Sequence, residues 1–145
     1  MKKIMLLLLL VVGISACSPE GDRRLSFQVE FLPVESIEMP EYMSSGQTYQ
    51  LKVYYKRPHD CHYYDGFYTE TDNQSQILAV QTLVIQNATC ESLLNEPSEY
   101  AFYEFKCPLY DELGTFNNVY EFKIYKGDDE EGRGVFETVQ VPISQ

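Results

Sequence analysis

The sequence contains no tryptophan, only two histidines and half as many basic residues as acidic ones. It also lacks the Gly-x-Ser-x-Gly elbow of serine hydrolases, the His-Glu-x-x-His motif of zinc proteases and a glycine-rich phosphate-binding loop. With 11 Lys and Arg against 22 Asp and Glu, the net charge is −11, which excludes a basic patch for nucleic-acid phosphates. From these absences we predict a protein that is not an enzyme, needs no cofactor or metal and does not bind nucleic acid.

Long apolar runs are missing as well. The longest extends only from Ile4 to Val12, whereas a membrane-spanning helix needs about twenty apolar residues. The run follows the positively charged residues 1–3 and gives way to small residues after Val12. This arrangement predicts a cleavable signal peptide rather than a transmembrane helix.

The residues that come next, Ile14-Ser15-Ala16-Cys17, resemble the lipobox of bacterial lipoproteins. The resemblance implies cleavage by signal peptidase II before Cys17 and attachment of three acyl chains, palmitate among them, to that cysteine. Each buried methylene contributes about 0.8 kcal/mol, so several chains would hold the protein stably at a membrane. Ser18 replaces the Asp that retains enterobacterial lipoproteins at the inner membrane, which implies an outer-membrane destination, facing the periplasm or the cell surface. The alternative is an ordinary secretory signal that leaves Cys17 free for a disulfide.

These features divide the chain into a signal peptide (1–16), a lipidated tether (17–24) and one folded domain (25–145). Cleavage before Cys17 removes two of the 11 basic residues and none of the 22 acidic ones, which leaves a net charge of −13. A chain this acidic is repelled by anionic headgroups. The lipid on Cys17, rather than the protein surface, is therefore expected to hold it at the membrane.

Period-two alternation recurs through the rest of the chain and indicates strands. The segments that show it, or that are rich in aromatic and β-branched residues, are 25–31, 49–55, 62–69, 77–86, 100–107, 120–124 and 135–141. The segment 77–86 is apolar on both faces, which is typical of a central strand. The sequence offers one candidate helix, at 90–95. We therefore predict an all-β fold, a single antiparallel β-sandwich of about seven strands. Its likeness to immunoglobulin domains is architectural only, because their buried tryptophan is missing.

The alternation also predicts which side chains form the core. They are Tyr49, Leu51, Val53, Leu83, Phe105, Tyr120, Phe122, Ile124, Val139 and Val141.

Three cysteines remain after Cys17, and an oxidising compartment favours one disulfide among them. In an up-and-down chain, the connections that contain Cys61 and Cys90 lie at the same end of the sandwich. Cys107 closes a strand at the opposite end and shares a face with Phe105. We therefore predict a Cys61–Cys90 disulfide and a buried, unpaired Cys107. If one predicted strand is a loop, pairing of Cys107 with either of the others becomes possible.

Two polar clusters are candidate ion sites. His59-Asp60-Cys61-His62 holds both histidines, but one short stretch rarely surrounds a transition metal, and a disulfide would remove the thiolate. The acidic run 128–131 lies between two glycines and lacks the alternating ligand spacing of an EF-hand loop. We interpret the first as a polar loop and the second as a solvated turn.

The segments 53–58 (VYYKRP) and 65–68 (DGFY) resemble those of small lipoproteins from marine Bacteroidetes. This resemblance brings no known activity with it.

The abundance of tyrosine provides the functional hypothesis. The side chains of Tyr54, Tyr63, Tyr64, Tyr68 and Tyr103 cannot all point into one core. Exposed tyrosines suit contact with proteins or glycans. We expect a non-enzymatic binding or adhesion module, held at the outer membrane through Cys17. The alternative is a structural or accessory subunit that docks permanently on an outer-membrane complex.

Overall fold

The computed structural model describes residues 26–72, 74–109 and 118–144. Within these residues the chain forms nine strands in two sheets and no helix, so it also contains no helix long and apolar enough to cross a membrane. The predicted lipidation site, Cys17, lies outside the described residues. The strands, in chain order, are β1 (Phe27–Leu32), β2 (Val34–Glu38), β3 (Met43–Ser44), β4 (Thr48–Tyr55), β5 (His62–Asp72), β6 (Ser75–Ile85), β7 (Glu99–Lys106), β8 (Val119–Asp128) and β9 (Gly134–Ser144).

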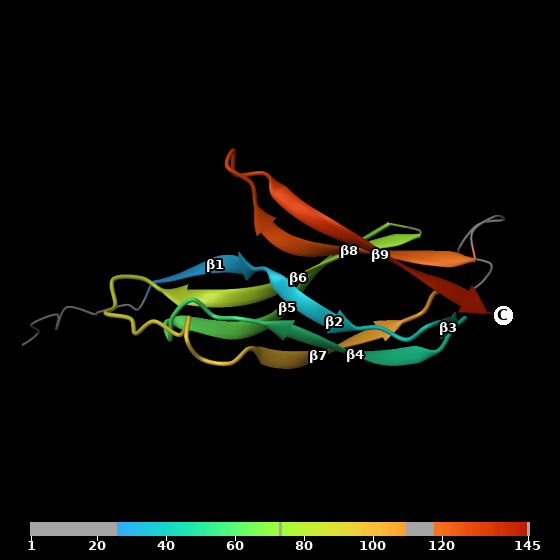
Figure 1. Ribbon diagram of the computed structural model, residues 1–145, viewed down its shortest axis with the longest axis horizontal. Coiled ribbons are helices and arrows are strands. Elements are labelled where there is room, and N and C mark those ends of the chain that lie inside the picture. The colour runs from blue at the N-terminus through green and yellow to red at the C-terminus, as the bar shows by residue number, and fades with distance from the viewer. Residues whose placement is uncertain (1–25, 73, 110–117, 145) are drawn as a thin grey trace, which may run out of the picture.

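The larger sheet has six strands and is built around β6 (Figure 1). One edge of β6 pairs with β5 in a long antiparallel hairpin. Its other edge is shared: β1 pairs antiparallel with residues 80–85, and β8 pairs parallel with residues 75–78. The sheet continues through the β8–β9 hairpin to β3, which lies parallel to β9. The prediction of a central strand at 77–86 is therefore confirmed.

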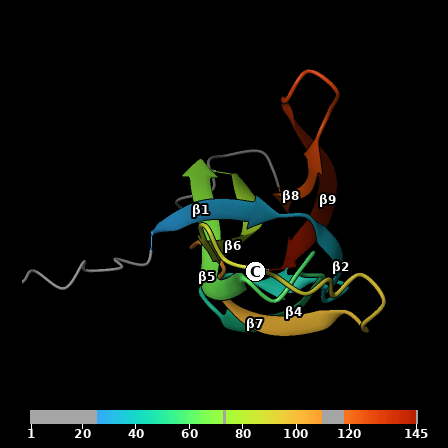
Figure 2. The same cartoon turned by 90° about the vertical axis from the view of Figure 1, so that its left-hand side faces the viewer.

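The prediction of a purely antiparallel sandwich is wrong. The strand that separates β6 from β8 in the sequence, β7, belongs to the other sheet, so no hairpin links β6 to β8 and they pair side by side in the same direction. The smaller sheet, in the order β2-β4-β7, is antiparallel throughout. The two sheets pack as a sandwich in which β4 and β7 form one layer, and the β8–β9 hairpin extends beyond it (Figure 2).

Each of the seven predicted strands overlaps an observed one, and two short strands were missed. Pro33 ends β1 as expected, but the chain enters the smaller sheet directly afterwards as β2. That strand carries two glutamates in five residues and shows little apolar alternation. The candidate helix at 90–95 is also wrong. Those residues form turns and an isolated bridge between Ser92 and His59.

The core lies between the sheets and confirms most of the predicted set. Seven predicted residues are buried, namely Leu51, Val53, Phe105, Tyr120, Phe122, Ile124 and Val141. Tyr49 and Val139 are partly buried and pack against them. Leu83 is the error, because its neighbours Thr82 and Val84 are the buried residues and Leu83 points to the opposite face of β6.

The same inversion is more pronounced in β1, which turns three apolar residues away from the core and buries only Leu32 at its end. Phe27, Val29 and Phe31 are 49%, 50% and 41% exposed. The interior side of the strand carries Glu30, whose Oε2 atom lies 3.2 Å from Nε2 of the buried His62. The backbone oxygen of Glu30 also accepts a hydrogen bond from the hydroxyl of Thr82. These polar contacts fix the strand with its apolar face toward solvent.

A Cys61–Cys90 disulfide closes the open end of the β5–β6 hairpin, with its Cα atoms 5.6 Å apart. Cys61 directly precedes β5 and accepts a hydrogen bond from the amide of Ile85, the last residue of β6. Both the predicted pairing and the buried, unpaired Cys107 are confirmed. The hairpin explains the pairing more directly than the alternation of connections, because the two cysteines flank strands that run side by side.

Candidate functional site

The outer surface of the six-stranded sheet carries a continuous set of apolar side chains. Strand register places them on one face: Phe27 is opposite Ile85, and Tyr68 is opposite Ala79. We call this set the outer apolar face. Its members are Phe27, Val29, Phe31, Tyr63, Tyr68, Ile77, Ala79, Leu83, Ile85, Tyr125 and Phe136.

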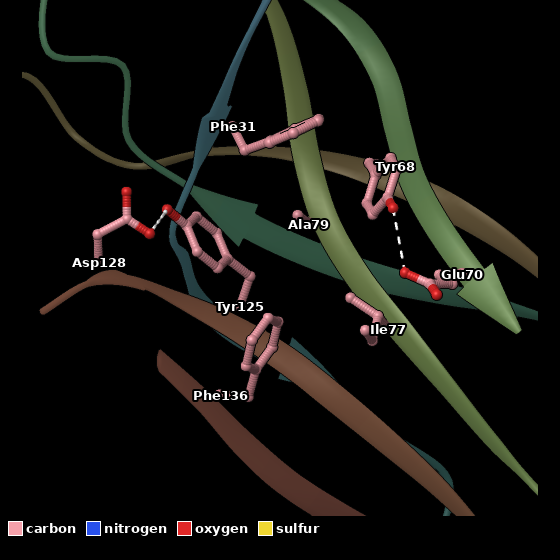
Figure 3. Close-up of a pocket in the computed structure, with 8 residues that line it drawn as sticks. All are labelled: Phe31, Tyr68, Glu70, Ile77, Ala79, Tyr125, Asp128 and Phe136. Atoms are coloured by element: carbon pink, nitrogen blue, oxygen red, sulfur yellow. Dashed lines mark hydrogen bonds between the residues drawn. The ribbon is translucent and has the colours of Figure 1, made fainter. Parts of the chain in front are cut away.

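A groove of about 330 Å³ lies in this face where β1, β5, β6, β8 and β9 meet (Figure 3). Ile77 and Ala79 of β6 form its floor. The described residues that line it are Phe31, Tyr68, Glu70, Ile77, Ala79, Tyr125, Asp128 and Phe136, and we call it the aromatic groove. Its size falls in the range of small-molecule and side-chain pockets, which begins at about 300 Å³.

Two aromatic pairs form the walls of the groove. The rings of Phe31 and Tyr68 have their centroids 4.8 Å apart at an interplanar angle of 45°. Those of Tyr125 and Phe136 are 5.8 Å apart at 55°. Tilted contacts of this kind restrict the rotation of both rings, so the walls are largely preformed.

Each wall also carries a carboxylate that is bound to its tyrosine. The hydroxyl of Tyr68 donates to Glu70 Oε2 at 3.2 Å, and the hydroxyl of Tyr125 donates to Asp128 Oδ1 at 2.9 Å. The two tyrosine–carboxylate pairs lie on opposite sides of the groove (Figure 3). The rim is therefore negatively charged on both sides.

These hydrogen bonds hold both phenols in their neutral form. Burial, the hydrogen bond to Asp128 and the charge of that carboxylate raise the pKa of Tyr125 to about 12. The hydrogen bond to Glu70 is the main cause that raises the pKa of Tyr68 above its usual value of 10.0. Both hydroxyls remain protonated at physiological pH, and both donate their single proton to a carboxylate of the protein itself.

The outer surface of the smaller sheet holds a second aromatic cluster, and this one contains its own cation. Lys52 Nζ lies 4.2 Å from the ring centroid of Tyr100 and 4.8 Å from that of Tyr54. The hydroxyl of Tyr54 donates to Glu38 Oε1 at 2.6 Å, and the same oxygen lies 3.9 Å from Lys52 Nζ. We call Glu38, Lys52, Tyr54 and Tyr100 the Lys52 cluster. Its surroundings, chiefly Tyr54, raise the pKa of Lys52.

The histidine-containing loop is held together by contacts within the protein. One ligand atom each from His59, Asp60, Cys61 and Cys90 lies within 4.8 Å of the others, but both sulfurs belong to the disulfide. Asp60 accepts a hydrogen bond from the Glu91 amide at 2.8 Å. These contacts agree with the interpretation of residues 59–62 as a polar loop that closes one end of the sandwich.

Desolvation lowers the pKa of the buried His62 below its usual value of 6.5, although Glu30 partly opposes this. His62 Nδ1 lies 3.2 Å from His59 Nδ1, so one ring donates to the other. The imidazole of His62 thus links the histidine loop to β1.

The acidic run 128–131 forms the turn of the β8–β9 hairpin. The carboxylate of Asp129 accepts hydrogen bonds from the amides of Glu131 and Arg133 and from the Arg133 side chain. Arg133 also bonds Glu131. The carboxylates of Asp129 and Glu131 are therefore paired within the turn itself.

The tyrosines singled out from the sequence take different positions. Tyr63, Tyr64 and Tyr68 are exposed, as the functional hypothesis required. Tyr54 belongs to the Lys52 cluster, and Tyr103 is partly buried against the core, where its hydroxyl accepts a hydrogen bond from Gln76 at 2.5 Å.

Sequence reasoning missed most of the groove, namely Phe31, Tyr125, Phe136 and the two carboxylates. The available signal was the apolar alternation of 27–31, combined with the polar residues of β6 that face the core.

Comparison of the chain with protein-family models, with curated proteins and with solved structures finds no match in any of the three.

Proposed function

We propose that this protein is a lipid-anchored, non-enzymatic binding module that docks a partner on its outer apolar face. The observation that carries the proposal is the exposure of Phe27, Val29 and Phe31 beside the aromatic groove. Soluble proteins rarely leave a contiguous apolar surface uncovered unless something binds there. Tyrosine and phenylalanine are also the residues that dominate the buried centres of protein interfaces.

The internal contacts of the sheet support a role in binding rather than in folding. The core is already complete between the two sheets, and it includes residues from β4, β7, β8 and β9. None of the residues of the outer apolar face belongs to that core cluster or to the partly buried residues that pack against it. A sequence under pressure for stability and solubility alone would place polar residues at positions 27, 29 and 31.

Two further parts of the proposal rest on the sequence. The lipobox resemblance supports attachment through Cys17 at the outer membrane, with the module facing the periplasm or the cell surface. The two-sheet architecture supports a comparison with immunoglobulin-like modules, which present sheet faces or loops to partners.

Site-specific photocrosslinking in the native host tests the docking face. A benzophenone amino acid replaces Phe27 or Phe31 in two variants, and Phe102 in a control variant. Phe102 is a matched control because it is also an exposed phenylalanine within a strand, on the smaller sheet. We expect one discrete crosslinked product from positions 27 and 31 and none from position 102. Products from position 102 alone, or no product from any position, would overturn the proposal.

The copy number of the crosslinked partner separates the two functional hypotheses. A product that forms with only part of the protein, and varies with growth conditions, supports a binding module. Quantitative crosslinking to one membrane complex identifies a permanent accessory subunit instead.

A further inference from the structure

We infer that the aromatic groove receives an arginine side chain presented by the partner protein. This inference rests on the proposed docking face and names the chemistry that the face recognises.

The groove has hydrogen-bond acceptors to offer a ligand, and its donors are already used. Among the described residues that line the groove, the only side chains with a hydrogen-bond donor are Tyr68 and Tyr125. Both donate to carboxylates of the groove itself. The side chains therefore offer a ligand only acceptors: the remaining lone pairs of Glu70 and Asp128, together with the ring faces. A ligand that satisfies them has to be rich in donors and poor in acceptors.

The charge of the groove favours a cationic ligand. The groove has a carboxylate on each side, and its described lining includes no lysine or arginine. Nearby basic groups are engaged elsewhere: Lys126 donates to backbone oxygens of Val34 and Glu35, and Arg133 binds Asp129. Lys123 is in register with Ile77 but does not line the groove. The whole chain has a net charge of −11, so its field also attracts cations.

The same molecule contains a precedent for a cation beside such groups. The Lys52 cluster combines tyrosine rings, a phenol that donates to a carboxylate, and an ammonium group over the rings. The aromatic groove contains the first two components twice, once with Tyr68 and Glu70 and once with Tyr125 and Asp128. The cation is the component that its described lining does not supply.

Guanidinium fits this site better than ammonium. It is planar and weakly hydrated, it stacks on aromatic rings, and its five N–H groups point outward in a fixed fork. A planar group stacked on one aromatic wall keeps its N–H fork in its own plane, where it can point toward a carboxylate of the rim. Guanidinium also has no acceptor, which matches a groove whose free side-chain groups are all acceptors.

The test uses the full mature chain in detergent micelles and two short peptides, acetyl-Gly-Gly-Arg-Gly-Gly-amide and the same peptide with citrulline. Citrulline has nearly the shape of arginine without its charge, so it is a matched control for the ligand. Binding is followed by the chemical shifts of tyrosine and phenylalanine ring protons. We expect the arginine peptide to shift the rings of Tyr68 and Tyr125 and to bind at least tenfold more tightly than the citrulline peptide. Equal binding of the two peptides would overturn the inference.

Two protein variants localise the site. Glu70→Gln and Asp128→Asn keep the shape of the groove and remove its charges. Together they are expected to lower the affinity for the arginine peptide at least tenfold. Glu38→Gln on the opposite surface is the matched control and is expected to leave its affinity unchanged. Should the double variant fold poorly, Glu70→Gln and Asp128→Asn are measured separately, and each is expected to weaken binding of the arginine peptide, whereas Glu38→Gln is not.

The outcomes also separate this inference from the proposed function. Crosslinking from positions 27 and 31 without binding of the arginine peptide refutes the cationic ligand and leaves the docking face intact. Displacement of a bound arginine peptide by a neutral oligosaccharide at equal concentration would identify the groove as a glycan site instead. Ring shifts confined to Tyr54 and Tyr100 would show that the peptide binds at the Lys52 cluster instead of the aromatic groove, and would also refute the inference.

Discussion

The two outer surfaces of this sandwich use the same side-chain chemistry and differ in one component. On the smaller sheet, Lys52 lies over Tyr54 and Tyr100 and approaches Glu38, so rings and carboxylate already have a cation. On the larger sheet, the aromatic groove has the rings and the carboxylates but draws no cation from its described lining. The comparison distinguishes a surface whose rings and carboxylate already contact a cation from one whose described lining supplies the rings and carboxylates alone. Exposure of aromatic residues alone would not have separated the two.

The largest expected effect is the loss of stability when a buried aromatic residue of the larger sheet is truncated, compared with an exposed one. Phe122 is fully buried, so Phe122→Ala is expected to lower the free energy of unfolding by about 3–5 kcal/mol. Phe31→Ala on the outer apolar face should lower it by about 1 kcal/mol or less. Urea denaturation of both variants gives the comparison. A loss of similar size from Phe31→Ala would mean that the outer face stabilises the fold rather than serving a ligand.

The next effect concerns the disulfide, which joins the β4–β5 connection to the β6–β7 connection, both of which pass between the two sheets. The bond joins residues 29 positions apart, so its loss in Cys61→Ser or Cys90→Ser is expected to cost about 3–4 kcal/mol. The double variant should be little worse than either single variant, because each already breaks the same bond. Thermal unfolding with and without reductant measures the effect. Additive losses would show that the cysteines act independently.

A smaller effect would come from emptying the Lys52 cluster. Lys52→Met removes the ammonium and keeps most of the aliphatic stem. The vacated rings and Glu38 are then expected to accept a second arginine peptide, more weakly than the aromatic groove does, because the cluster lies on an open surface. Peptide titration should change from one site to two. A stoichiometry that stays at one would show that matching components are not sufficient and that the concavity of the groove matters more.

The smallest effect is a pH dependence carried by His62. Its pKa in the folded protein lies below 6.5, so as pH falls through that value the unfolded chain takes up a proton before the folded one does. The free energy of unfolding should therefore decrease between pH 7 and the lower pKa of the folded state. In His62→Gln this component disappears. Urea midpoints of the two proteins at pH 7 and pH 5 provide the measurement, and an equal decrease in both would rule out His62 as the cause.

The sequence predicted the strands and the covalent link well because both depend on local patterns. Alternation identifies residues 49–55 and 120–124 as strands whatever their partners are. Adjacent strands joined by the short turn around residue 74 bring Cys61 and Cys90 together. Buried positions in β4 and β8 agree with the same alternation, because in both strands the apolar face is the one that packs into the core.

The sequence could not predict which face of β1 would be buried. A period of two shows which residues share a face but not which face lies inward. In β1 the choice depends on Glu30, whose contacts with His62 and Thr82 come from β5 and β6. The parallel pairing of β6 with β8 is likewise a property of the assembled sheets. The aromatic groove depends on both features, which explains why three of its four rings were missed.

The register shift between Tyr64 and Gly66 in β5 has a consequence for behaviour at high surface density. Within the described residues β5 pairs only with β6, so its other side is a free sheet edge that could recruit strands from neighbouring molecules. The bulge, which uses a φ of 121° at Gly66, interrupts that edge, and Asp65 beside it adds a charge. Both features disfavour edge-to-edge pairing between copies of the chain at high local concentration.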